Sequence, residues 1–547
     1  MFKFFNNKIL NGQSRTITSA AIVLAGATLA SRFLGLLRDR LLAGHFGAGD
    51  TLDIYYAAFR IPDLVYNLLI LGALSAGFIP VFVSLWGKNN EEDKAAWHFV
   101  SSLLNILAIG MVILGGIFFL AAPYIMKLIT PGFSGEKMNL TVQMSRLMFL
   151  SPILLGVSSV WGGVLQSLKR FFIFSLTPIF YNLGIILGIL FLVPRFGIFG
   201  LAYGVVLGAF LHMLVQLPTI LHLGFRFRFV LDWKDAGVRR LSKVTVPRVL
   251  DLAISQLNFV AITMLASGLT AGSLAVFNLA YNIWNFPLGI FAAPLAIAAF
   301  PTLAQNAAQK DRRVFAQNFS STFRQILFLI IPASALFLVL RAQIVRVILG
   351  TGKFDWTDTI LTINTLQYFA LALFAEALNL LLIRSFFAHE DTKTPLILGF
   401  ISSVFRIGGA WFFSRYLGEA GLGVAGLALG YAFGGILLFF LLWVFLRRKA
   451  GGLNETEIIK SGGKIIAASV VAGGAAWLVL RILAVFFDTH TVLGIFTQGF
   501  VAGVSGIAVY ILAGLALRSP EMQVFWRSLK NRLPWRAVAP DKELIQE

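Results

Sequence analysis

The sequence contains no cysteine and few charged residues. The absence of Cys among 547 residues excludes disulfides, thiolate metal sites and thiol catalysis. The six histidines show no metal-ligand spacing, and neither an HExxH pattern nor a Walker loop occurs. Charged residues make up 13% of the chain, against about a quarter in ordinary globular proteins. We therefore expect neither an enzyme nor a metal or organic cofactor, and a soluble multidomain protein is excluded.

Apolar residues are abundant instead. They make up 58% of the chain and include 52 Phe, more than a soluble protein could cover with polar surface. The net charge of +20 would suggest nucleic acid in a soluble protein. Here Lys and Arg gather in loops beside apolar runs, as the orientation of a membrane protein requires. We expect an all-α polytopic membrane protein with no nucleic-acid partner.

Apolar runs long enough to cross a bilayer recur along the whole chain. A spanning helix needs about 20 mostly apolar residues, which predicts about fourteen spans. Pro62 and Pro80 favour kinks within one of them, and Pro287 favours a kink within another. The expected spans are 17–43, 54–86, 98–128, 143–168, 171–193, 196–222, 244–268, 273–300, 322–346, 360–383, 394–415, 420–446, 463–487 and 491–517.

The distribution of Lys and Arg between alternate loops predicts the orientation. With the N-terminus inside, basic residues concentrate in the inward segments and the C-terminal tail, which places both termini in the cytoplasm. The predicted segments are a cytoplasmic N-terminal segment 1–16, a first lobe 17–222, a basic linker 223–243, a second lobe 244–446, a linker 447–462, two further helices 463–517 and a cytoplasmic tail 518–547.

The two predicted lobes repeat each other weakly at an offset of about 220 residues. Three segments recur in the same order, and the clearest is Gly197-Ile-Phe-Gly200-Leu-Ala-Tyr-Gly204, which returns as Gly423-Val-Ala-Gly426-Leu-Ala-Leu-Gly430. A repeat of six helices has parallel topology. Transporters commonly place the substrate site between two such repeats and rock one against the other. The last two helices fall outside the repeat.

Several charged residues fall inside predicted spans, where a charge costs a few kcal/mol unless it faces a cavity or a partner. Some of them can be explained without a ligand. Arg248 and Asp251 could neutralise each other, and Arg38 could extend to the membrane–water interface while Asp39 caps a loop. The charged residues of this kind are Arg32, Arg38, Asp39, Asp53, Arg60, Arg248, Asp251, Glu376 and Arg406.

Arg32 is the hardest of these to explain without a ligand. It lies in the middle of its span, and no acid occurs three or four residues away on the same helix. A guanidinium in that position favours an anion, and its planar donors match phosphate oxygens. The sequence predicts a basic cavity for an amphiphile with a phosphate head and a long apolar tail.

The first two predicted helices carry a specific signature. Ser31-Arg32-Phe-Leu-Gly35-Leu-Leu-Arg38-Asp39, Phe46-Gly47-Ala48-Gly49, Asp53 and Ala58-Phe59-Arg60-Ile61-Pro62-Asp63-Leu64 closely resemble the opening of the MurJ/MviN family. Supporting matches are Pro131-Gly132-Phe133, Ser255-Gln256, Asn285-Phe286-Pro287, Gly352-Lys353-Phe354-Asp355 and Asp391-Thr392-Lys393-Thr394-Pro395. The family consists of flippases for lipid II, the undecaprenyl-pyrophosphate precursor of peptidoglycan.

The resemblance implies a fold, a location and a substrate. The fold would be two six-helix lobes around a central cavity, as in multidrug and polysaccharide exporters, with two extra C-terminal helices. The protein would be a monomer of the bacterial cytoplasmic membrane that moves lipid II outward by alternating access, with cell-wall synthases as further partners. Arg32 and Arg38 would hold the pyrophosphate, and Asp39, Asp53 and Arg60 match further positions associated with flipping.

The sequence departs from the family at several cavity positions. Many members carry a basic pair and a glutamate where this chain has Tyr66, Asn67 and Leu71, and an arginine and a glutamate where it has Asn282 and Asn285. We therefore place Asn282 and Asn285 in the substrate site, and our hypothesis is that Arg248 supplies the missing cation.

The departures leave the energy source and the cargo open. Asp251, Glu376 and Arg406 are candidates either for coupling to a monovalent cation, Na⁺ or H⁺, or for charge pairing. The membrane potential is the other source of energy. Two alternative functions remain: export of another polyprenyl-pyrophosphate saccharide, and antiport of a cationic drug, which Arg32 disfavours.

Overall fold

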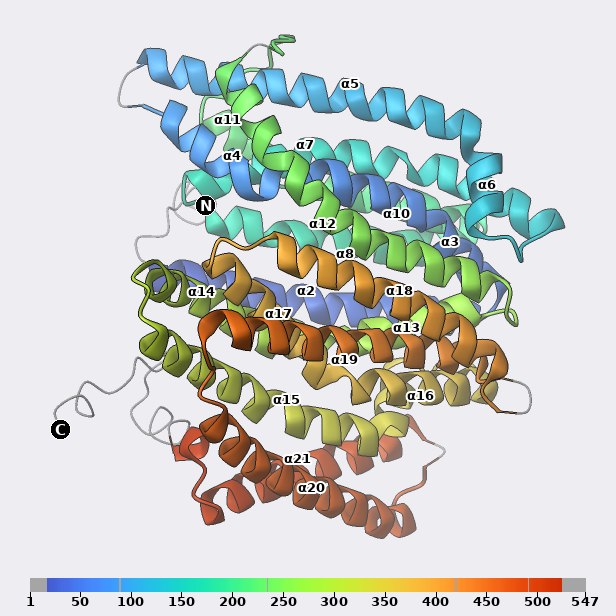
Figure 1. Cartoon of the computed structure of the whole chain (residues 1–547). Coiled ribbons are helices and arrows are strands. Elements are labelled where there is room, and N and C mark those ends of the chain that lie inside the picture. Colours follow the sequence, from blue (N-terminus) through green and yellow to red (C-terminus); the bar gives the residue numbers. More distant parts are fainter. Residues whose placement is uncertain (1–16, 88–89, 234, 419–420, 490, 524–547) are drawn as a thin grey trace, which may run out of the picture. The chain divides into compact units, whose positions relative to one another are not determined.

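The computed structural model describes residues 17–87, 90–233, 235–418, 421–489 and 491–523, and every regular element in these ranges is helical. The contacts divide the chain into two compact units, residues 1–275 and 276–547. Each unit is described by itself below. The all-α prediction is confirmed, and Figure 1 traces the helices along the chain.

Unit 1 consists of long helices, several of which are interrupted. Tyr66–Leu71 (η2) and Gly188–Leu192 (η3) are π-helical turns, and η2 begins four residues after Pro62, where a kink was predicted. The α-helices are α2 Ile17–Phe46, α3 Asp50–Val65, α4 Gly72–Leu85, α5 Asn90–Ile129, α6 Gly135–Met148, α7 Leu150–Ser167, α8 Phe171–Leu187, α9 Val193–Phe196, α10 Phe199–Leu214, α11 Leu217–His222 and α12 Ala236–Ser267.

Unit 2 begins within α13 and contains the remaining helices. A π-helical turn, η4 (Leu288–Ala292), directly follows Pro287, which again matches a predicted kink. The α-helices are α13 Ser273–Pro287, α14 Ala293–Ala308, α15 Arg312–Ile348, α16 Trp356–Leu371, α17 Leu373–Ala388, α18 Lys393–Tyr416, α19 Gly423–Ala450, α20 Glu455–Phe486 and α21 Val492–Ala516.

Many of these helices suit a bilayer. Among the described residues, ten are long and apolar enough to cross a membrane, or eleven if the bent pair α16 and α17 forms one span. Their outer faces keep large apolar side chains exposed, such as Leu120, Tyr124 and Val485. Such faces are stable only against lipid. The protein is therefore a multi-pass membrane protein; the predicted total of about fourteen spans is compatible with this count but not established by it.

The repeated glycines have the same role in both units. In unit 1 a Cβ at Gly204 would overlap Gly188 of η3, and one at Gly200 would overlap Val193. In unit 2 a Cβ at Gly430 would overlap Ala410 of α18, and Gly426 lies equally close to Phe413. Glycine permits this close approach of helix backbones. The matching segments α10 and α19 thus each pack closely on the helical segment before them, as expected of a structural repeat.

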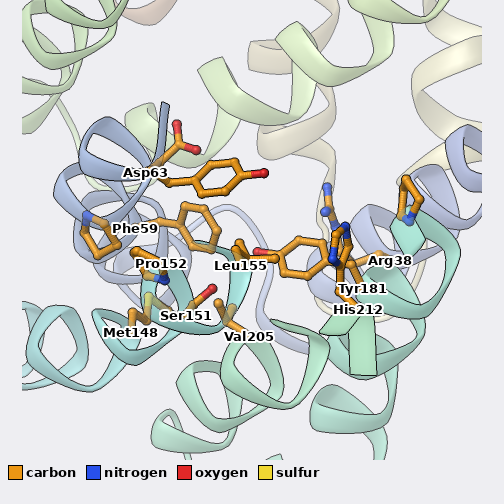
Figure 2. A pocket seen from close by; sticks show the side chains of 13 residues that line it. Arg38, Phe59, Asp63, Met148, Ser151, Pro152, Leu155, Tyr181, Val205 and His212 are labelled. Atoms are coloured by element: carbon orange, nitrogen blue, oxygen red, sulfur yellow. The ribbon is translucent and has the colours of Figure 1, made fainter. Parts of the chain in front are cut away.

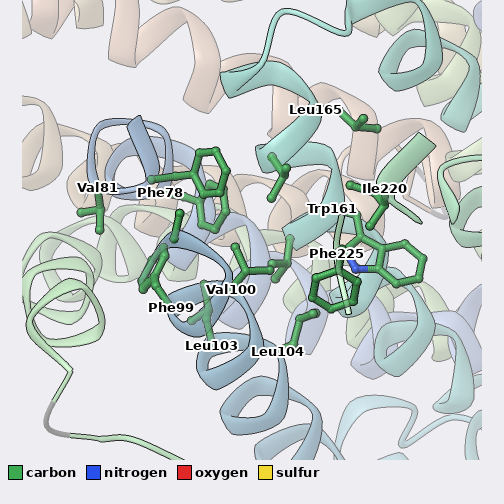
Figure 3. Packing of buried hydrophobic residues seen from close by; sticks show 14 of the residues in the cluster. Phe78, Val81, Phe99, Val100, Leu103, Leu104, Trp161, Leu165, Ile220 and Phe225 are labelled. Carbon is green, nitrogen blue, oxygen red and sulfur yellow. The ribbon is translucent and has the colours of Figure 1, made fainter. Parts of the chain in front are cut away.

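A cluster of buried aliphatic and aromatic residues forms a core in unit 1 (Figure 3). Phe78 stacks on Phe82 and contacts Phe99 of α5, and Trp161 of α7 meets Phe225 edge to face. A Cβ at Gly163 would lie 2.5 Å from the Phe78 ring, so α7 needs glycine there. This packing fixes α4, α5 and α7 relative to one another.

The division by contacts falls within α13, so α12 is grouped with unit 1, where it packs on α3, α4 and α5. The predicted lobes, 17–222 and 244–446, stay a prediction. In unit 2, α20 and α21 pack on each other and on α15 through Leu340, Leu480 and Ala502.

Candidate functional site

A cavity of about 270 Å³ lies inside unit 1, between α3 and the helices α6, α7, α8 and α10. Its lining is mainly apolar and aromatic, with Arg38, Asp63, Ser151, Tyr181 and His212 as polar members. Figure 2 shows Asp63 at one side of this cavity and Arg38 with His212 at the other. The cavity thus brings charges of both signs together in a largely apolar surround.

Arg38 is held in the cavity wall by three hydrogen bonds. Its Nε and Nη2 atoms donate to Oδ1 of Asp39, at 3.0 and 2.8 Å, and Nη1 donates to Oδ1 of Asn182 at 3.2 Å. Asp39 is almost fully buried, whereas the Arg38 side chain is 21% exposed. A guanidinium has five N–H donors, so Arg38 keeps donors for a further partner. Asp39 both neutralises Arg38 and fixes its orientation.

Asn182 connects this pair to the helix that carries it. Its amide nitrogen donates to the backbone carbonyl and the hydroxyl of Ser31, each at 3.3 Å. Gly35 faces the same amide, because a Cβ there would lie 4.0 Å from Oδ1 of Asn182. These contacts join α2 to α8. The residues Ser31, Gly35, Arg38 and Asp39 of the sequence signature therefore share one interface.

Asp63 and Tyr66 form the other polar part of the cavity, and Asn67 is bonded to Asp63. The sequence analysis did not assign Asp63 to the site. Asn67 donates to a carboxylate oxygen of Asp63 at 3.0 Å, and the Tyr66 hydroxyl lies 3.2 Å from that of Ser159. Tyr66 and Asn67 occupy positions where basic residues were noted as usual in relatives. Here they serve as neutral hydrogen-bonding groups, and the acid Asp63 faces the cavity near them.

Arg32 lies on α2 and is partly exposed, but it is not among the residues that line this cavity. The cavity described above is therefore not the basic cavity that the sequence predicts around the Arg32 guanidinium. Its contact with pyrophosphate remains a prediction. Of the two arginines, Arg38, six residues later on the same helix, is the one that lines this cavity.

Asp53 is buried, and its carboxylate is bonded to neighbouring parts of the chain. Its carboxylate accepts hydrogen bonds from Nζ of Lys137 at 3.0 Å and from the backbone N–H groups of Gly272 and Ala275, at 2.8 and 3.0 Å. Gly272 has φ +86°, and a Cβ there would overlap the carbonyl of Ala48. Asp53 thus fastens the turn after α12 to the start of α3, all within unit 1.

Arg60 is buried against α12. Its Nε donates to the Thr263 hydroxyl at 3.0 Å, and its guanidinium carbon lies 5.3 Å from the centre of the Phe259 ring. Contact with an aromatic face compensates for part of the lost hydration. Arg60 thereby joins α3 to α12, and its predicted contact with substrate stays a prediction.

The charged residues predicted for the second lobe have different outcomes. Arg406 donates from Nη2 to Oε1 of Glu376 at 2.6 Å, and its guanidinium lies 3.8 Å above the Tyr431 ring. Of the two roles left open, charge pairing is the one that the geometry supports. Asn282 and Asn285 lie partly exposed on α13. The side chains of Arg248 and Asp251 lie outside the described part of the chain, so the hypothesis about Arg248 is untested.

A group of three residues of types that can bind metal ions lies close together in space, although His98 is distant in sequence from Asp232 and Asp235. The ligand atoms of His98, Asp232 and Asp235 lie within 4.8 Å of one another, and His98 Nε2 is 3.6 Å from Asp232 Oδ2. The sequence offered no signal for it, because His98 is on α5 and the carboxylates precede α12. All three are partly exposed, and such groups are common on surfaces.

Comparisons with known proteins agree on one family. The family model described as "Lipid II flippase MurJ" matches residues 42–497. "Probable lipid II flippase MurJ" of Rhizobium tropici is 28% identical over 537 residues, covering 96% of this chain and 98% of that protein. "Lipid II flippase MurJ" of Burkholderia cenocepacia is 26% identical over 464 residues, covering 83% and 88%.

Solved structures show the same fold. "Lipid II flippase MurJ, inward closed conformation" has a TM-score of 0.74 at 24% identity and covers 93% of this chain and 100% of that one. An inward-facing multidrug resistance MATE family transporter of the MOP superfamily has a TM-score of 0.65 at 17% identity, covering 80% and 99%. The exporter-type fold expected from the sequence is confirmed.

Proposed function

The chain belongs to the MurJ family of lipid II flippases, and from this membership we propose that it carries lipid II from the inner to the outer leaflet of the bacterial cytoplasmic membrane. The observation that carries the proposal is the family match over residues 42–497. Asn182 lies inside this range, and its partner Arg38, which lines the cavity, precedes the range by four residues. The protein is a transporter in this proposal and performs no covalent chemistry.

Arg38 is the residue to which we assign the first contact with the pyrophosphate. Asp39 and Asn182 use three of its donors and keep the guanidinium plane fixed. The remaining N–H groups can donate to phosphate oxygens, and such charge-assisted bonds are short and strong. Because the Asp39 carboxylate neutralises the Arg38 guanidinium, Arg38 can remain in an apolar environment when no substrate is bound. Arg32, about 9 Å away along the same helix, is the second proposed donor.

Lipid II would enter sideways from the inner leaflet, its head meeting these donors while its tail stays in lipid, and alternating access would release it outward. Both termini would be cytoplasmic, and the protein would act as a monomer, with contacts to cell-wall synthases as a further expectation. We propose the membrane potential as the energy source, since moving one charge through 100 mV supplies about 2.3 kcal/mol. The Arg406–Glu376 pair supports this choice over a cation bound by Glu376, because Arg406 already neutralises that carboxylate.

A second candidate cargo is another polyprenyl-pyrophosphate saccharide. Tyr66 and Asn67 favour it, because they make neutral hydrogen bonds at positions noted as usually basic. A cavity with less positive charge suits a head group with fewer acidic substituents. The phosphate-binding role of Arg38 is common to both candidates.

The test is replacement of the flippase in a host depleted of its own. Supplying this chain should restore growth, and Arg38→Ala should abolish the rescue at equal expression. Exposed Arg195 provides the control, since Arg195→Ala should rescue fully. In vesicles, the wild type should make lipid II accessible from outside, faster with an imposed potential. Rescue without lipid II accessibility, or accessibility of another saccharide lipid alone, would contradict the assignment.

The same assay tests the two predictions that the structure leaves open. Arg32→Ala and Arg248→Ala should each impair flipping if both arginines contact the head group. If Arg248→Ala left flipping intact while Arg32→Ala abolished it, the compensation by Arg248 would be wrong.

A further inference from the structure

A second polar pocket lies in unit 2, where α14, α15, α17 and α19 end or begin. It has a volume of about 250 Å³ and is lined chiefly by Asn306, Lys310, Arg312, His389 and Lys449. It is remote in sequence from every residue assigned to lipid II above. It lies at helix termini, and the ends of membrane-spanning helices meet the lipid head groups.

The lining is positively charged. Cations outnumber carboxylates even when Asp391, the ion-pair partner of Lys449, is counted with Asp311. Asp311 is already used, because its Oδ1 accepts from the backbone N–H of Val314 at the start of α15. In the part of the chain that the structure describes, neither Lys310 nor Arg312 has an ion-pair partner. The pocket therefore favours an anion.

Asn306 adds an independent observation. The residue lines the pocket, and only 7% of it is exposed. Its amide nitrogen Nδ2 is buried and has no hydrogen-bond partner among the residues that the structure describes. A buried donor without an acceptor costs about 1–3 kcal/mol. An amide nitrogen can only donate, so the group that would satisfy it is an acceptor.

His389 fits the same ligand. Its Nδ1 lies 2.9 Å from the backbone carbonyl of Ser385, so this nitrogen carries the proton, and its ring meets Phe315 edge to face at 4.5 Å. The ring is thereby oriented from two sides. Nε2 is left as the nitrogen that becomes a second donor when the ring is protonated.

We propose that this pocket, which we call the α14–α15 pocket and define by Asn306, Lys310, Arg312, His389 and Lys449, binds a phosphate group. Two cations without partners, a buried amide donor and an oriented imidazole suit the several acceptor oxygens of a phosphate. Basic pockets between helices at the membrane surface bind phospholipid head groups, and a soluble phosphate would present the same oxygens. The proposal does not depend on the identity of the transported lipid.

The experiment measures thermal unfolding of the full-length protein in mixed micelles. Phosphatidylglycerol is titrated against phosphatidylcholine of the same acyl chains, and inorganic phosphate is titrated separately against chloride at constant ionic strength. Stabilisation by phosphatidylglycerol alone identifies a lipid head group as the source. Stabilisation by inorganic phosphate, with nothing added by the lipid, identifies a soluble anion.

Variants distinguish binding in the α14–α15 pocket from attraction of anions by the positive charge of the surrounding surface. Lys310→Gln/Arg312→Gln should weaken apparent affinity about fivefold for each cation, equivalent to about 1 kcal/mol per residue. The matched control is Arg313→Gln/Arg448→Gln, which removes the same charge from exposed neighbours that do not line the pocket. Asn306→Leu should also weaken binding without lowering the stability of the ligand-free protein. Equal losses in both double variants, or no stabilisation by either anion, would overturn the proposal.

Discussion

Unit 1 and unit 2 each contain an arginine that pairs with a carboxylate on a predicted membrane helix, and the two arginines are covered to different degrees. Arg38 pairs with Asp39, its neighbour in sequence, and faces a cavity. Arg406 pairs with Glu376 on another helix and is covered by the Tyr431 ring, so only 9% of its side chain is exposed. Both charges are neutralised locally, but only Arg38 keeps donors directed at a cavity. A charge inside the membrane is therefore not by itself evidence of a ligand. What the charged group faces besides its ion-pair partner, a cavity for Arg38 and the Tyr431 ring for Arg406, distinguishes a binding role from a structural one.

The largest expected effect concerns Arg38. Arg38→Gln/Asp39→Asn replaces both charges together and should leave folding nearly unchanged, because no buried ion is left alone. Flipping should fall about ten- to a hundredfold, since a hydrogen bond to a charged group contributes about 1.5–3 kcal/mol. The measurement is the rate of lipid II accessibility in vesicles together with the melting temperature. If the double variant flipped lipid II at the normal rate, Arg38 would have only a structural role, as we infer for Arg406.

The next effect concerns the stability of unit 2. Arg406→Met leaves the partly buried Glu376 carboxylate without its cation. The variant should be less stable, by at most the roughly 3–5 kcal/mol that breaking a fully buried pair costs. Glu376→Gln/Arg406→Met should recover most of that loss and should flip lipid II normally. Thermal unfolding and the vesicle assay test both statements. If the double variant folds well but loses its response to an ion gradient, the pair has a coupling role after all.

A smaller effect is expected at Gly435, which faces the same ion pair. A Cβ there would overlap Oε1 of Glu376, so Gly435→Ala must displace the carboxylate from Arg406. Overpacking of this kind costs about 1–3 kcal/mol. Gly408→Ala on α18 is the control, because nothing lies within 4 Å of its added methyl. Equal melting temperatures for the two alanine variants would show that the pair tolerates movement.

The smallest effect concerns an ion pair outside the membrane spans, Lys449 with Asp391. Partial burial would raise the pKa of Asp391, but the Lys449 ammonium and the donors of Thr394 outweigh it and lower the pKa to about 2. The unfolded value is about 3.9, so the stabilisation is complete above that pH and is lost as pH falls toward 2.

Asp391→Asn should therefore lower stability at pH 7 by less than about 1 kcal/mol, as for other pairs near a surface. The difference from wild type should shrink between about pH 4 and pH 2. Melting temperatures measured across this range provide the check. A difference that persists at pH 2 would mean that packing, rather than the charge, accounts for it.

The sequence predicted the architecture better than the contacts of individual residues. Apolar runs located the helices, and the prolines at 62 and 287 marked places where π-helical turns follow. The length of an apolar run suffices to locate a spanning helix, because the thickness of the bilayer sets that length. The partners of Arg406 and Asp53 could not be predicted, since Glu376, Gly272 and Ala275 lie on segments that only packing brings near them.

The candidate site shows the same division. Arg38 and Asp39 were expected in it and line or support the cavity, whereas Arg32 lies outside its lining and Asp63 was missed. All four belong to the sequence signature of the first two predicted helices. Which of them faces the cavity depends on the rotation of each helix and on contacts such as Gly35 with Asn182, and neither follows from residue spacing alone.

The amino-acid sequence by itself determined that this chain is helical, enters a membrane and belongs among lipid flippases, because apolar length, the placement of basic loops and the helix 1–2 signature are local properties. Tertiary structure alone decided which buried charge is exposed to a cavity and which is sealed by a neighbour. The physical reason is that desolvation of a charge depends on everything packed around it, and those atoms come from distant parts of the chain.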